Sequence, residues 1–112
     1  MSQRIIYISG PITGHENGNR HAFAHAADLL RSQGHRVINP HDLTEGLDLH
    51  PIDDYEKIMR IDVAHLVQRA EEVVTLDGWE NSNGAKREVE IARLMNIPII
   101  PLVKYASLNK PQ

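Results

Sequence analysis

The sequence predicts an α/β fold, a flavodoxin- or Rossmann-like three-layer sandwich in which a parallel sheet of about four strands lies between helices. Short runs of apolar and β-branched residues alternate along the chain with longer segments whose apolar side chains recur at helical spacing. The length of 112 residues fits one domain covering residues 1–112. Because parallel crossovers are right-handed, we expect the strand order 2-1-3-4.

The first expected strand covers residues 4–9 and is apolar on both faces, as in a buried parallel sheet. It runs into a loop with glycine at positions 10 and 14 and proline at position 11. At the carboxyl end of a strand, such a loop exposes backbone N–H groups that suit phosphate or sugar oxygens. Ser9, Gly10 and Pro11 are therefore candidate substrate-binding residues, although a tight turn that needs glycine would give the same pattern.

The segment that follows this loop has the spacing of a helix over residues 19–33, with Asn19 as its N-cap and Gly34 at its end. A short second strand is expected over residues 36–39. The loop over residues 41–50 is long for a compact α/β domain. It is either a lid beside a site or a plain surface excursion.

The next helix is expected over residues 51–69, with Pro51 in its first turn. Its apolar arc carries Ile52, Tyr55, Met59, Val63, Leu66 and Val67. Asp62 lies at the edge of this arc, where a hydrophobic residue is expected. A carboxylate in that position costs free energy unless another group satisfies it.

The third strand is expected over residues 73–76, and Asp77 and Trp79 lie in the turn that leaves it. In the expected order the first and third strands are neighbours. Their carboxyl ends bring together Tyr7, Ser9, Gly10, Asp77 and the amino end of the following helix. Asp77 and Trp79 are therefore further candidate substrate-binding residues.

The helix after this turn is expected to be capped by Ser82 or Asn83 and to run to Asn96. Its apolar arc contains Ala85, Val89, Ile91, Ala92 and Met95. Glu88 falls inside that arc, so it either reaches the rim of the core and a salt bridge or has a functional role. Two misplaced acids, Glu88 and Asp62, on helices that flank the same end of one sheet indicate a pair that works together.

The last expected strand covers residues 97–102 and contains two prolines, which favours an edge position. We expect the tail from Lys104 to be frayed or docked on a neighbour.

Composition excludes several classes of function. The net charge of −3 gives no basic surface for a nucleic acid polymer, and no apolar run is long enough to cross a membrane. Cysteine is absent, which excludes disulfides and thiolate chemistry and fits a cytoplasmic location. His21 and His25 have the spacing of a metal pair but lie on the polar side of their helix, so we expect no metal site.

Three motifs follow one another in the sequence. Residues 7–11 read Tyr-Ile-Ser-Gly-Pro, residues 60–62 read Arg-Ile-Asp, and in residues 84–92 a glycine stands four residues before Glu88 and an alanine four after it. They resemble the opening signature, the Arg/Asn-x-Asp helix motif and the nucleophile motif of the nucleoside 2-deoxyribosyltransferase-like superfamily. The resemblance is to its small phage and bacterial branch of uncharacterised domains, and it runs from Ile5 to about Leu102.

The resemblance implies cleavage of an N-glycosidic bond without a cofactor. Glu88 would attack C1′ of the sugar, Tyr7 would orient its carboxylate, and Asp62 would act as acid or base at the nucleobase or water. Ser82 stands where the family's nucleoside transferases carry an aspartate and its nucleoside monophosphate hydrolases carry a phosphate-binding serine. Ser82, with a helix amino terminus behind it, therefore favours a nucleotide over a nucleoside and hydrolysis over transfer. Gly84, from the nucleophile motif, is a further candidate substrate-binding residue.

The chain departs from these relatives in its glycine loop, which has Pro11 and Thr13, and in lacking an obvious fifth strand. A non-catalytic nucleotide-binding or sensing module on the same fold is the alternative, although it would not need two buried acids. A response-regulator-like domain would need acids where this chain has Ser9 and Gly10. The relatives complete their sites with a neighbouring subunit, so we expect a homodimer or a homotetramer.

Overall fold

A computed structural model of the protein describes residues 2–106. The elements are β1 (Ile5–Ser9), the 3₁₀ turn η1 (Glu16–Asn19), α1 (Arg20–Ser32), β2 (Arg36–Ile38), α2 (Pro40–Leu43), α3 (Tyr55–Arg69), β3 (Glu72–Thr75), the 3₁₀ turn η2 (Trp79–Asn81), α4 (Asn83–Leu94), β4 (Ile99–Pro101) and α5 (Leu102–Ala106).

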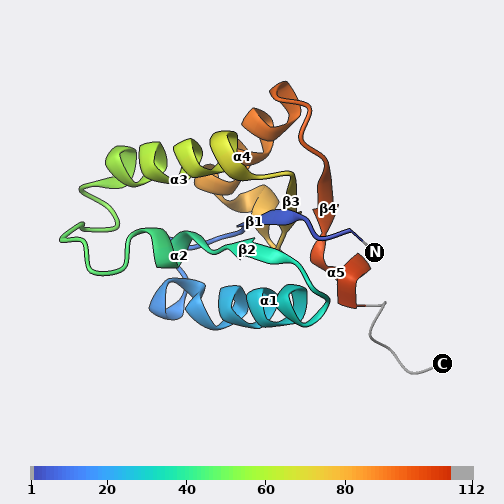
Figure 1. The fold of residues 1–112 in the computed structure, drawn as a ribbon. Helices are drawn as coiled ribbons and strands as arrows, with labels where there is room; N and C mark the ends of the chain where they lie inside the picture. The colour runs from blue at the N-terminus through green and yellow to red at the C-terminus, as the bar shows by residue number, and fades with distance from the viewer. Residues whose placement is uncertain (1, 107–112) are drawn as a thin grey trace.

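The sheet has four strands in the order β2-β1-β3-β4, and every neighbouring pair is parallel. Helices α3 and α4 lie over one face and α1 over the other, so the architecture has three layers (Figure 1). The predicted fold class and strand order are confirmed. β1 and β3 are the central strands, and the proline-containing β4 lies at an edge as expected.

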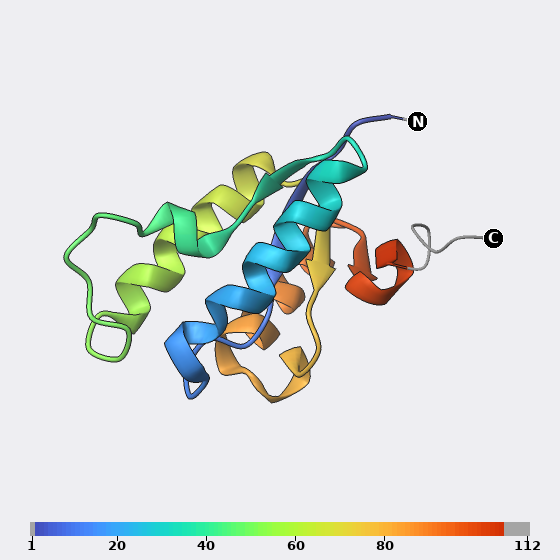
Figure 2. The same cartoon turned by 90° about the horizontal axis from the view of Figure 1, so that it is seen from below.

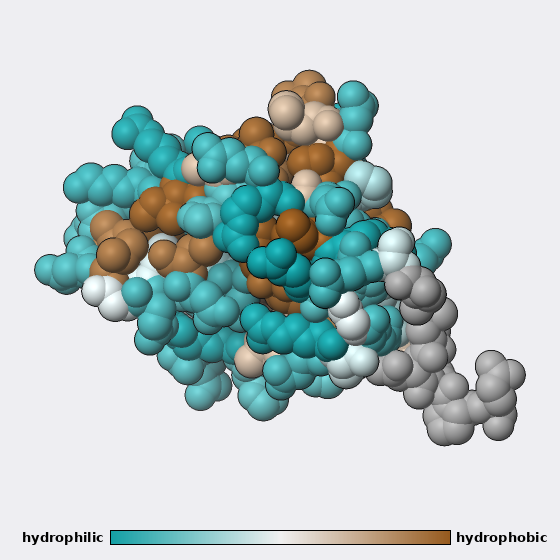
Figure 3. Space-filling view, viewed as in Figure 1, coloured by the Kyte–Doolittle hydropathy of each residue, from teal (hydrophilic) through white to brown (hydrophobic). Residues whose placement is uncertain are grey.

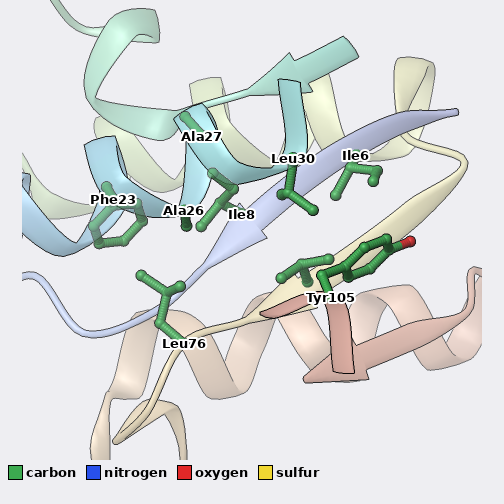
Figure 4. Close-up of a cluster of buried hydrophobic side chains, with 9 residues drawn as sticks. Ile6, Ile8, Phe23, Ala26, Ala27, Leu30, Leu76 and Tyr105 are labelled. Atoms are coloured by element: carbon green, nitrogen blue, oxygen red, sulfur yellow. The ribbon is translucent and has the colours of Figure 1, made fainter. Parts of the chain in front are cut away.

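Side chains of β1 alternate between the two faces of the sheet, as the period of a strand requires. Ile6 and Ile8 enter the cluster beneath α1, which also contains Phe23, Ala26, Ala27, Leu30, Val74, Leu76 and Tyr105 (Figure 4). Tyr7 enters the opposite cluster, with Ile38, Leu66, Val73 and Ala92. Seen from below, α1 lies over the sheet and runs roughly along the direction of β1 (Figure 2). Tyr7 and Ser9 are two residues apart in the strand, so both side chains lie on the face of the sheet that α3 and α4 cover.

The second strand is one residue shorter than predicted and leads directly into a helix that we did not expect. The Asn39 Oδ1 accepts a hydrogen bond from the backbone N–H of His41 at 3.0 Å, which caps α2. Pro40 occupies its first turn, where its missing N–H costs nothing. Asn39 therefore ends the strand and begins the helix.

Helix α3 begins at Tyr55, four residues later than predicted, and Pro51 is not in it. The His50 ring Nδ1 accepts from the N–H groups of Ile52 and Asp53 at 3.2 and 3.1 Å, which closes a separate turn before the helix. Ile52 is 68% exposed and belongs to no packing face of α3. The loop between α2 and α3 consequently extends outward from the body of the molecule (Figure 2).

Two helix ends also differ from the prediction. Asn19 has φ of 61° and makes no side-chain cap on α1; its amide donates to the Pro11 carbonyl at 2.9 Å instead. Helix α4 ends at Leu94, and Met95, predicted to pack inward, is 50% exposed. Asn96 takes a left-handed φ of 58°, which stops the helix there.

The carboxyl-terminal segment was predicted to fray or to dock on a neighbour, but it forms α5 and docks on its own chain. Tyr105 is buried, and its hydroxyl donates to the carboxylate of Glu72. Arg4 forms an ion pair with Glu72 at 2.7 Å. The part of the predicted tail beyond Ala106 lies outside the described residues.

Within residues 2–106, no helix combines the length and the apolarity that crossing a membrane would require.

Candidate active site

The end of β1 supplies two hydroxyl groups to one point on the α4 side of the sheet. Tyr7 and Ser9 are fully buried and, being two residues apart, project from the same face. The next residue has to be glycine, because a Cβ at Gly10 would lie 2.8 Å from the side chain of Leu76. The strand can therefore pass close to β3 and open directly into the loop that follows.

Helix α4 brings Glu88 to these hydroxyls. The Ser82 Oγ accepts from the N–H of Ala85 at 3.2 Å, so the predicted cap is present and fixes where the helix starts. Glu88 lies in the second turn and is 5% exposed. Its Oε2 accepts from the Tyr7 hydroxyl at 2.6 Å and its Oε1 from the Ser9 hydroxyl at 2.7 Å. Each carboxylate oxygen thus has one short hydrogen bond from β1.

Asp62 is the second buried acid of this region. It projects from α3 and is 3% exposed, and its buried Oδ1 has no hydrogen-bond partner within residues 2–106. Burial, and secondarily the charge of Glu88, raises the pKa of Asp62 from 3.8 to about 8. An unpartnered oxygen and a raised pKa both favour the protonated form near neutral pH.

Glu88 differs from Asp62 in its hydrogen-bond donors. Burial raises the pKa of Glu88 to about 7, while the hydrogen bonds from Tyr7 and Ser9 oppose that rise because they favour the ionised form. Burial and the neighbouring Glu88 raise the pKa of Tyr7 well above its ordinary value, so its hydroxyl keeps its proton. The site therefore favours one proton on Asp62 and the negative charge on Glu88.

A pocket of about 80 Å³ opens over this acid pair. It is lined by Gly10, Ile12, Thr13, Pro51, Tyr55, Ile58, Met59, Asp62, Ser82, Gly84, Ala85 and Glu88. A larger cleft of about 560 Å³ continues from it toward the loop between α2 and α3. Asp62 lines both spaces, together with Ile12, Thr13, Pro51 and Ile58. Asp62 thus stands between the pocket that contains Glu88 and the larger cleft.

The rim of this cleft carries exposed apolar side chains. Leu47 and Ile52, which line the cleft, are 51% and 68% exposed. Figure 3 shows hydrophobic surface gathered over the loop between α2 and α3. This loop, which the sequence left as either a lid or a surface excursion, forms one wall of the cleft.

The other sequence-predicted residues fall into two groups. Gly84 and Ser82 line the pocket with Gly10. Pro11 is buried and packs near Gly78, while Asp77 is exposed and Trp79 half-buried. Neither Asp77 nor Trp79 is among the residues that line the pocket or the larger cleft.

Tyr55, Ile58 and Met59 were not predicted as site residues, yet all three line the pocket. The sequence did hold a signal for two of them. Tyr55, Met59 and Asp62 are spaced by four and three residues, so they occupy one face of α3. A role for Asp62 would therefore have pointed to Tyr55 and Met59 as well.

His21 and His25 are both exposed on α1. Over residues 2–106, no cluster of three or more potential metal-binding side chains is found.

Comparisons with known proteins place this geometry in context. A family model described as Domain of unknown function (DUF4406) matches residues 4–101. The chain belongs to this family. No curated protein matches this DUF4406 chain.

Among solved structures, the DUF4406 chain is similar to a 2-deoxyribosyltransferase from the psychrotolerant bacterium Bacillus psychrosaccharolyticus, described as a biocatalyst for the synthesis of nucleosides. The TM-score is 0.66 at 19% sequence identity, and the match covers 87% of this chain and 70% of the other. At that identity the likeness establishes a shared fold.

Proposed function

We propose that the protein cleaves the N-glycosidic bond of a nucleoside or nucleoside 5′-monophosphate. The observation that carries the proposal is the state of the two buried acids. Glu88 receives a short hydrogen bond on each oxygen, and Asp62 has an oxygen without a partner. One acid is thus prepared to attack and the other to give a proton, which is the division of labour that glycosidic chemistry needs. The fold shared with a 2-deoxyribosyltransferase supports the same assignment.

Glu88 is the proposed nucleophile. Its ionised carboxylate attacks C1′ of the sugar, the C1′–N bond breaks, and its electron pair leaves with the base. A covalent glycosyl ester results. Tyr7 and Ser9 hold both carboxylate oxygens, so the attacking group is oriented before the substrate arrives.

Asp62 is the proposed acid. Its proton passes to a nitrogen of the departing base, which avoids release of an anion. In the second step the ionised Asp62 takes a proton from water, and the resulting hydroxide attacks C1′ and releases Glu88. With a second base in place of water, the same step gives transfer.

The order of groups along the site supports the placement of a nucleotide. Ser82 and Glu88 line the smaller pocket but not the larger cleft, whereas Asp62 lines both. A sugar with C1′ at Glu88 would direct its 5′ substituent toward Ser82 and its base past Asp62 into the cleft. A helix amino terminus favours an anion, so a 5′-phosphate is preferred over a free hydroxyl, and we favour hydrolysis over transfer.

The test is a panel of nucleosides, nucleoside monophosphates and NAD, scored for free base by chromatography. Glu88→Ala should abolish base release while leaving the fold intact, at some cost in stability because the buried hydroxyls of Tyr7 and Ser9 lose their acceptor. Glu90→Ala is the matched control, since Glu90 is exposed on the same helix and forms an ion pair with Arg93. Mass spectrometry of enzyme trapped with a 2-fluorinated sugar analogue should find the adduct on Glu88. An adduct elsewhere, or full activity in Glu88→Ala, would overturn the proposal.

A further inference from the structure

Tyr55 is a pocket residue whose hydroxyl proton has no acceptor in the described part of the chain. It is the first residue of α3 and lies on the same helical face as Met59 and Asp62. Its hydroxyl oxygen is buried beside the Arg87 guanidinium, and within residues 2–106 no acceptor takes the hydroxyl proton. A buried polar group without a partner costs free energy, so its presence needs an explanation outside the packing of the chain.

The hydroxyl of Tyr55 points at the amino-terminal turn of α4. A Cβ built on Gly84 would lie 3.5 Å from the Tyr55 oxygen, and Gly84 is two residues beyond the helix cap Ser82. Because Gly84 has no side chain, the Tyr55 hydroxyl faces the first turn of the helix with no side chain of Gly84 between them. Both residues line the pocket that contains Glu88 and the unpartnered oxygen of Asp62.

The charges around Tyr55 identify the kind of partner that is missing. The guanidinium carbon of Arg87 lies 5.7 Å from the centre of the Tyr55 ring, and Arg87 is held there by two hydrogen bonds to Glu56 at 2.7 and 3.3 Å. Arginine has only donors, so it cannot accept the proton of the Tyr55 hydroxyl. What this hydroxyl lacks is an acceptor, and the nearby cation and helix amino terminus favour an anionic one.

We propose that Tyr55 binds the 5′-phosphate of the substrate by donating its hydroxyl proton to a phosphate oxygen, beside Ser82 and the first turn of α4. This inference rests on the proposed function and deepens it, since it makes Tyr55 a residue that selects nucleoside 5′-monophosphates over nucleosides. A phosphate oxygen satisfies the hydroxyl with a charge-assisted hydrogen bond, whereas a free 5′-hydroxyl is a weaker acceptor.

Tyr55→Phe tests the proposal, because it removes one oxygen and nothing else. The ratio of kcat/KM for a nucleoside 5′-monophosphate to kcat/KM for the matching nucleoside should fall about tenfold, the loss of one charge-assisted hydrogen bond. The melting temperature should change little, because the hydroxyl proton has no acceptor within residues 2–106 and Arg87 keeps its hydrogen bonds to Glu56. Tyr105→Phe is the matched control: it loses a hydroxyl that donates to Glu72, so it should melt earlier and leave the ratio unchanged.

A second measurement separates failure of this inference from failure of the proposed function. Thermal shift with a nucleoside 5′-monophosphate reports binding without turnover. If the wild type binds the monophosphate but releases no base, and Tyr55→Phe weakens binding, the inference holds and the proposed chemistry fails. Base release with an unchanged ratio in Tyr55→Phe would overturn the inference alone. If the monophosphate neither binds nor reacts, both are overturned.

Discussion

Replacing Asp62 by Asn should make the protein more stable at alkaline pH, and the effect should vanish in acid. Asp62 is 3% exposed and one of its oxygens has no partner. Asn keeps the shape of the protonated acid but cannot ionise. The substitution therefore removes the free energy that the folded protein loses when Asp62 becomes charged beside Glu88.

The magnitude and the sign follow from the pKa of Asp62, which burial and the charge of Glu88 raise from 3.8 to about 8. Between these values the folded protein binds a proton that the unfolded chain has released, so stability falls as pH rises through this window. Each pH unit corresponds to about 1.4 kcal/mol, so the full penalty above pH 8 is about 6 kcal/mol. Below pH 4 the acid is protonated in both states and contributes nothing.

Urea unfolding of wild type and Asp62→Asn between pH 5 and pH 9 measures this difference directly. The variant should gain little at pH 5 and several kcal/mol at pH 9. Glu90→Gln serves as the control, because Glu90 is exposed and its removal should leave the pH dependence unchanged. A stability difference between wild type and Asp62→Asn that stays constant over this range would refute the reasoning.

Three further outcomes are expected. The profile of kcat/KM against pH should be bell-shaped, rising as Glu88 ionises with a pKa of about 7 and falling as Asp62 loses its proton with a pKa of about 8; a flat profile from pH 5 to pH 9 would contradict the acid pair. Ser82→Ala should lower the free energy of unfolding by about 1 kcal/mol through the lost helix cap. It should also weaken nucleoside monophosphate binding by about 1.5–3 kcal/mol in calorimetry. An equal loss of binding for nucleosides would show that Ser82 acts only as a helix cap. We propose a homodimer or a dimer of dimers, supported by the short edge strand β4 and by exposed Leu94 and Val103; a monomer at micromolar concentration in light scattering would exclude it.

Much of the fold could be predicted because local and global signals agree. The β-branched runs, the helical spacing between them and the handedness of crossovers are enough to predict the order β2-β1-β3-β4. The helical phase of α3 and α4 likewise predicted that Asp62 and Glu88 would lie among apolar side chains, and both are buried. Hydrophobic periodicity assigns each residue to a face of its helix. An acidic residue on the apolar face can therefore be recognised from the sequence alone.

The features that were missed depend on side-chain hydrogen bonds that no period reveals. Asn39 caps α2, and His50 closes the turn before α3. Because of these hydrogen bonds, β2 ends earlier and α3 begins later than predicted. The docking of α5 depends on Tyr105 meeting Glu72, which is 33 residues away in the sequence. Tyr55 reads as an ordinary core residue of its helix. Only the structure reveals that its ring packs against Arg87 while no acceptor within residues 2–106 takes its hydroxyl proton.

The two acids receive different roles from their surroundings, although they share one pocket. Both are buried, and burial raises the pKa of each. The two acids differ in the hydrogen-bond donors around them. The alternation of side chains along β1 places the hydroxyls of Tyr7 and Ser9 on the two oxygens of Glu88. One oxygen of Asp62 has no hydrogen-bond donor within residues 2–106. Two residues of one strand thus decide which acid holds the charge and which holds the proton. The loop that follows the strand begins with Gly10 in the same pocket, so β1 orients the proposed nucleophile and forms part of the surface that its substrate would meet.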